Sequence, residues 1–80
     1  MVIIEGKHIT DKETLWKELH QKMELPEYFG NNLDALADVL SEKKEKIEVK
    51  ILDVQEIEEN LGGYGKSFLR ILEEFCVLKF

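Results

Sequence analysis

The acidic residues near the middle of the chain have the type and spacing best suited to chemistry. The segment Met23–Glu42 carries five of them and no Lys, Arg or His: Glu24, Glu27, Asp34, Asp38 and Glu42. Asp34 and Asp38 are four residues apart, so on a helix they share one face, where like charges repel by roughly 0.2 to 0.5 kcal/mol. Only Asp34 is near enough to the expected helix start for the helix dipole to offset this repulsion. The pattern fits either a solvated acidic face or a surface that binds a cationic partner.

A catalytic interpretation of these carboxylates is the competing hypothesis. Asp34 and Asp38 could hold Mg²⁺ weakly or act as an acid and a base, which would make the protein a small metal-dependent enzyme. The two histidines, His8 and His20, form no recognised ligand or triad spacing with each other. Cys76 adjoins a predicted core strand, where a free cysteine usually packs as a small apolar side chain. We therefore expect no enzyme, no cofactor and no metal site.

The Gly-Lys-Ser run at Gly65–Ser67 resembles the end of a phosphate-binding loop. That motif requires another glycine five positions before Gly65, where this chain has Asn60. It should also follow a strand, whereas here it follows a helix expected to end near Leu61. We expect an ordinary helix stop and restart, and no small-molecule substrate.

Length and charge restrict the possible partners. The 80 residues make one small domain over 1–80, and 17 acidic against 11 basic residues give a formal charge of −6. This charge should repel phosphate backbones and anionic lipid, so neither nucleic acid nor membrane is expected as a partner. The apolar run Val2–Ile4 is too short for a signal peptide or a membrane span, and a single cysteine forms no internal disulfide. We expect a cytoplasmic protein.

The first half of the chain should form a strand and two helices. Val2–Glu5 is short and β-branched, which predicts a strand. Thr10 and Glu13 have the spacing of a capping box, so a helix should begin there and end before Pro26. The apolar stripe of this helix consists of Leu15, Trp16, Leu19 and Met23.

The second helix should be amphipathic and should carry the acidic pair. Asn32 is a suitable N-cap for it. One side of the helix is apolar and contains Leu33, Leu36, Ala37, Val39 and Leu40. The opposite side contains Asp34, Asp38 and Glu42. The carboxylates are therefore expected to point away from the core.

The second half should repeat the order of strand and helices. Ile47–Leu52 alternates as a half-buried strand does, and Asp53 should cap a short helix that ends at Gly62-Gly63. A last helix over Gly65–Phe75 precedes a terminal strand over Cys76–Phe80. The inward residues of the two helices are expected to be Val54, Ile57, Leu61, Phe68, Ile71, Leu72 and Phe75.

This order of elements predicts an α/β fold. Each pair of successive strands is joined by a long helical connection, which parallel strands require. The expected architecture is a small three-stranded parallel sheet packed with about four helices.

The segment Leu25–Leu36, with the sequence Leu-Pro-Glu-Tyr-Phe-Gly-Asn-Asn-Leu-Asp-Ala-Leu, closely resembles the barstar family. Asp38 and Leu40 continue the resemblance, and the expected order of strands and helices agrees with it along nearly the whole chain. The members of this family are intracellular inhibitors of barnase-type ribonucleases. The resemblance implies a small three-stranded parallel sheet with packed helices, in agreement with the pattern of the residues.

The resemblance also implies a partner-binding surface on the loop and the acidic helix. The residues implied are Tyr28, Phe29, Gly30, Asn32, Leu33, Asp34, Ala35 and Asp38, with Glu74 on the last helix. Asp38 would occupy a substrate-phosphate position among the basic side chains of the ribonuclease. Asp34 would pair with neighbouring bases, Tyr28 would pack against the catalytic histidine, and Glu74 would meet a cation at the rim.

Several positions depart from the type protein of the family. Ala37 stands where that protein has Trp, Phe29 replaces a second Tyr, and Ser41–Lys46 is richer in lysine. The chain is also shorter after Glu73, so Glu73 is an alternative to Glu74 at the rim.

The resemblance makes a barnase-like, extracellular-type basic ribonuclease the expected partner of an inhibitor that uses no cofactor. Two alternatives stay open. One is an immunity protein that uses the same face against a different basic toxin domain, and the other is the metal-dependent enzyme that would use Asp34 and Asp38.

Overall fold

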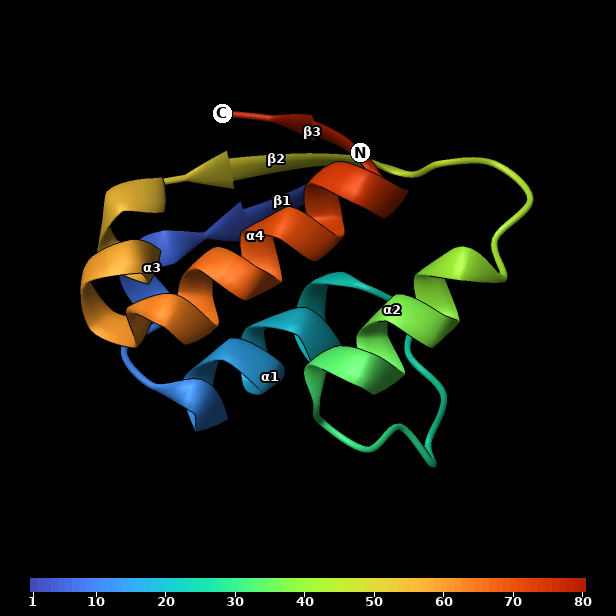
Figure 1. Cartoon of the computed structure of the whole chain (residues 1–80), viewed down its shortest axis with the longest axis horizontal. Coiled ribbons are helices and arrows are strands. Elements are labelled where there is room, and N and C mark those ends of the chain that lie inside the picture. Colours follow the sequence, from blue (N-terminus) through green and yellow to red (C-terminus); the bar gives the residue numbers. More distant parts are fainter.

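A computed structural model, which describes all 80 residues, shows one three-stranded sheet with the helices gathered on one side of it (Figure 1). The strands are β1 (Val2–Glu5), β2 (Glu48–Leu52) and β3 (Val77–Lys79). The helices are α1 (Lys12–Lys22), α2 (Leu33–Ser41), α3 (Val54–Leu61) and α4 (Gly63–Phe75), and a short 3₁₀ helix, η1 (Gly6–His8), follows β1. The predicted α/β architecture of three parallel strands and four helices is confirmed.

The sheet has one buried face and one exposed face. The strand order is β1-β2-β3, and both neighbouring pairs are parallel, with Ile4 opposite Ile51 in the register. Ile4, Val49 and Ile51 point into the protein and are almost wholly buried, whereas their strand neighbours Ile3 and Lys50 are exposed. The alternation follows from the period of two in a strand, and it fixes which side of the sheet the helices cover.

The core lies between the sheet and the helices. It contains sixteen buried apolar side chains, among them Leu15, Leu36, Ile57, Phe68 and Leu72 from the four helices. Cys76 belongs to this core, and burial raises the pKa of its thiol. The prediction that Cys76 packs as a small apolar side chain is confirmed, so the cysteine offers no reactive thiolate.

The cap of α1 differs from the sequence prediction. Asp11, not Thr10, is the N-cap, and its carboxylate accepts the Thr14 N–H at 2.8 Å. The Thr14 hydroxyl in turn accepts the Asp11 N–H at 3.0 Å, so Thr14 replaces Glu13 in the capping box. Hydrogen bonding of the ionised carboxylate, first by the Thr14 backbone N–H and then by the Thr14 side chain, lowers the pKa of Asp11. The predicted box was displaced by one residue because Thr10 and Asp11 are adjacent and are both suitable caps.

Two junctions in the second half also differ. Asp53 occupies the N-cap position of α3 as predicted, but it adopts a left-handed φ of 54° and makes no side-chain capping bond. The last helix begins at Gly63 rather than Gly65, because Gly62 turns the chain with a φ of +57° and accepts the Lys66 N–H. Gly65 therefore lies inside α4. The Gly-Lys-Ser run belongs to the first turns of this helix and does not form a phosphate-binding loop.

Close packing of η1 against the end of β2 explains why residue 6 is a glycine. A Cβ on Gly6 would stand 2.3 Å from the Asp53 carbonyl oxygen, closer than any side chain could tolerate. Gly6 thus allows η1 to pass directly against the turn into α3.

None of the helices has both the length and the apolar character needed to cross a membrane.

Candidate functional site

The segment between α1 and α2 forms a turn that projects one aromatic side chain and buries the next. In Figure 1 this segment makes a long excursion at the edge of the molecule before α2 begins. The Phe29 N–H donates to the Pro26 carbonyl at 3.0 Å, which closes the turn. Tyr28 is 89% exposed, whereas Phe29 is 9% exposed and lies in the core. The Tyr28 ring is therefore almost fully open to solvent, whereas the Phe29 ring is mostly covered by the core.

Asn32 starts α2 as predicted. Its side-chain oxygen accepts the Ala35 N–H at 2.7 Å, and its side-chain NH₂ donates to the Gly30 carbonyl at 3.2 Å. One side chain therefore satisfies a free N–H of the helix and also holds the end of the preceding turn. This bridge fixes the loop relative to the acidic helix.

The acidic pair lies on the exposed side of α2. Leu36 and Leu40 are buried, whereas Asp34 and Asp38 are exposed, so the predicted orientation of the helix is confirmed. Neither aspartate takes part in an ion pair, and neither side chain accepts a hydrogen bond from the protein. Both carboxylates are consequently free for an external cation.

A shallow hollow of about 220 Å³ lies where the turn meets α2. Its lining residues are Tyr28, Phe29, Gly30, Ala35, Asp38, Val39 and Glu42. Five of these belong to the predicted site, so the structure brings together residues up to ten positions apart in sequence. Val39 and Glu42 line the hollow without having been predicted as site residues, although Glu42 falls on the same acidic side of the helix. An exposed aromatic ring beside a carboxylate suits a planar cationic side chain.

The other predicted site residues lie outside this hollow. Asn32 and Asp34 are exposed near the start of α2, and Leu33 is half-buried there. Glu74 and Glu73 are both exposed on α4, which packs against α2. The choice between Glu74 and Glu73 as the rim contact therefore stays a prediction.

A second acidic group, which the sequence did not reveal, lies where the second half of α1 meets β1 and η1. Glu18 is buried, with 4% exposure, and its carboxylate accepts the Glu5 N–H at 2.9 Å. Lys22 and His8 lie 3.8 Å and 3.5 Å from this carboxylate. Glu18 directly precedes Leu19 of the apolar stripe, and Lys22 lies one helical turn later. The Glu5 N–H and His8 come from distant segments, so the local pattern did not indicate its burial.

The spacing of possible metal ligands bears on the enzyme alternative. Glu5, His8 and Glu18 form the one group of three such side chains with ligand atoms within 4.8 Å of one another. The Lys22 ammonium already contacts both of its carboxylates, at 3.7 and 3.8 Å. Asp34 and Asp38 belong to no such group, so the structure gives the metal-dependent enzyme no support at these residues.

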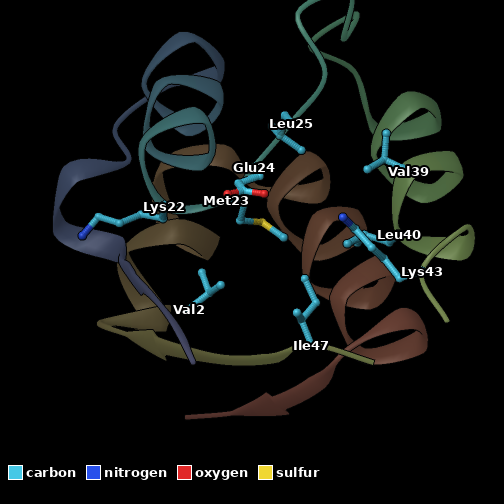
Figure 2. Close-up of a pocket in the computed structure, with 9 residues that line it drawn as sticks. All are labelled: Val2, Lys22, Met23, Glu24, Leu25, Val39, Leu40, Lys43 and Ile47. Atoms are coloured by element: carbon cyan, nitrogen blue, oxygen red, sulfur yellow. The ribbon is translucent and has the colours of Figure 1, made fainter. Parts of the chain in front are cut away.

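An apolar pocket of about 250 Å³ lies on the other side of Val39 (Figure 2). Met23, Leu25, Leu40 and Ile47 supply much of its apolar lining. Figure 2 shows the Lys22 side chain extending away from the pocket. Its ammonium contacts the carboxylates of Glu5 and Glu18. Six of its nine lining residues are apolar, and the other three are Lys22, Glu24 and Lys43.

Comparison with known proteins gives two findings. The chain matches the family described as "Barstar (barnase inhibitor)" over residues 1–77. It is also 32% identical over 74 residues to a curated protein of Bacillus subtilis (strain 168) named "Putative ribonuclease inhibitor YrdF". That match covers 91% of this chain and 81% of the relative. Both findings agree with the resemblance at Leu25–Leu36, and both extend it to most of the chain.

Proposed function

The chain belongs to the barstar family, and we propose from this that it inhibits a basic ribonuclease of the barnase type by occupying the active site with the turn and the acidic side of α2. A ribonuclease-inhibitor role is what the family and the Bacillus subtilis relative support. The inhibitor would act by blockade alone, with no turnover and no cofactor.

The observation that carries the proposal is the pair of exposed aspartates without a partner of their own. Asp34 and Asp38 stand on one face of a helix that is fixed by its cap and its core leucines. An enzyme that binds RNA must present a positive cleft, so a preformed negative face gains both attraction and correct orientation. The overall charge of −6 acts in the same direction.

Each residue of the surface has a chemical part in this proposal. Asp38 borders the hollow and would take the place of a substrate phosphate among arginine and histidine side chains. Tyr28 would pack against the catalytic histidine, and Asp34 would pair with bases beside it. Backbone groups near Gly30 and in Asn32–Ala35, including half-buried Leu33, would add hydrogen bonds and contact area. The Phe29 ring would contribute only indirectly, by holding the turn.

An RNA-cleavage assay in which the protein is mixed with a barnase-type ribonuclease tests this proposal directly. The wild-type protein should inhibit RNA cleavage at micromolar concentration or below. Asp38→Ala should weaken binding by at least about 3 kcal/mol, as expected of a central hot spot. Barstar is itself a standard example of such hot spots, so this figure is a family precedent rather than a property derived for this chain.

Glu24→Ala provides the matched control. Glu24 is also an exposed acid in the same segment, but it lines the neighbouring apolar pocket and not the hollow at Asp38. Its removal should change binding by less than about 1 kcal/mol. Equal small effects at Glu24 and Asp38 would contradict the proposed surface. Absence of inhibition by the wild-type protein would favour an immunity function against a different basic toxin domain.

A further inference from the structure

A single side-chain hydrogen bond joins helix α1 to the turn before α2. The His20 Nε2 lies 2.8 Å from the Asn31 Oδ1. Because a side-chain amide oxygen can only accept, the histidine ring must donate through Nε2. The two residues are eleven positions apart, so this bond closes the whole connection between the helices.

Asn31 needs this support because of its backbone. It adopts a φ of 50°, in the left-handed region that residues other than glycine seldom enter, although asparagine enters it more readily than most. At this point the chain leaves the turn and enters the cap of α2. The bond from His20 therefore holds the residue at which the direction of the chain changes.

The same histidine also supports the turn through Phe29. The His20 ring meets the Phe29 ring edge-on, with centroids 5.7 Å apart, and Trp16 meets it from one helical turn earlier at 5.6 Å. Phe29 is thus held by two aromatic side chains of α1, while its neighbour Tyr28 remains almost fully exposed. The turn is fastened at Phe29 and at Asn31, on either side of Gly30.

We infer that His20 and Trp16 are positioning residues that fix the turn for its partner before contact. This inference rests on the proposed function, because it concerns the same surface. A loop that is ordered before binding loses less conformational entropy when the partner binds. A smaller part of the favourable contact free energy is then offset by the cost of ordering the loop. Helix α1 would then govern affinity although neither side chain needs to touch the partner.

The variant His20→Ala tests the inference. His20 is exposed, so its truncation should leave the fold intact, and denaturant unfolding would verify this. We expect the inhibition constant against a barnase-type ribonuclease to rise about tenfold. Amide hydrogen exchange in Tyr28–Asn31 of the free protein should also become about tenfold faster. A residue with only a general structural role would change unfolding without this local effect.

Two further variants sharpen the test. Gln21→Ala removes an exposed side chain next to His20 that makes no hydrogen bond to the turn and faces a hollow lined by His8 and Glu18. It should change neither the inhibition constant nor the exchange rate. His20→Gln offers an amide NH₂ near the place of Nε2 and should recover most of the lost inhibition. Failure of the glutamine variant to improve on alanine would contradict a role for the hydrogen bond.

The results separate this inference from the proposed function. If Asp38→Ala abolishes inhibition while His20→Ala changes neither inhibition nor exchange, the inference is wrong and the proposed function stands. If the wild-type protein inhibits no ribonuclease, the proposed function fails, and the exchange of Tyr28–Asn31 still decides the positioning role. Faster exchange in His20→Ala would support that role, and unchanged exchange would overturn it.

Discussion

Carboxylates occur in two opposite situations in this protein. Glu18 of α1 is buried, and its carboxylate is contacted by the Glu5 N–H, the Lys22 ammonium and the His8 ring. Asp38 of α2 is exposed and takes part in no ion pair. One side chain is satisfied entirely within the chain, and the other is satisfied only by water until a partner arrives.

The difference assigns separate tasks to the two regions. A buried carboxylate without partners would be very unfavourable, so the fold supplies them, and the Glu18 group ties β1 and η1 to α1. Exposed acids carry no such requirement and add little to stability. Their placement on one helix face, despite mutual repulsion, is what a binding function would explain.

Removal of the buried acid should have the largest effect on folding. Glu18→Ala leaves the Glu5 N–H without its acceptor and Lys22 without one of its two carboxylates, so the free energy of unfolding should fall by about 2 kcal/mol. Glu18→Gln keeps an acceptor and should lose less. Urea unfolding measures both, and inhibition by the folded fraction should be unchanged. A loss of inhibition in the folded protein would break the separation of the two regions.

The sequence predicted the fold because periodicity decides it. Strand alternation at Val49 and Ile51 and the helical stripe at Leu36 and Leu40 identify the buried faces without knowledge of tertiary contacts. The outward orientation of Asp38 follows from the same helix geometry, so this part of the candidate site was also predictable.

The supports of the site could not be predicted, because they depend on long-range contacts. The bond from His20 to Asn31 spans eleven positions, and that from Glu18 to the Glu5 N–H spans thirteen. Neither has a local signature. The burial of Phe29 beside an exposed Tyr28 is equally invisible, since either aromatic residue could have been the core residue. Sequence thus indicates the surface and gives little about what holds it.

An intermediate effect is expected at the rim of the proposed surface. Glu74→Ala should weaken ribonuclease inhibition by about 1 kcal/mol, because an exposed ion pair with the partner contributes little more. Glu73→Ala is the matched control, because Glu73 is equally acidic and exposed but points about 100° away on the helix. The binding free energy of the Glu73→Ala variant should change by less than about 0.5 kcal/mol. A larger effect at Glu73 would transfer the contact to that residue.

The smallest effect concerns the stability of the acidic face itself. Asp38→Asn removes the repulsion with Asp34 one turn earlier, and Asp38 is too far from the helix start to lose a favourable dipole interaction. The free energy of unfolding should therefore rise by roughly 0.2 to 0.5 kcal/mol, while inhibition is largely lost. Asp34→Asn is the control: it removes the same repulsion but also a favourable interaction with the helix start, so it should give no gain. Matched urea titrations of the three proteins would resolve this difference. A lower stability for Asp38→Asn would mean that Asp38 serves the fold, and the contrast with Glu18 would then fail.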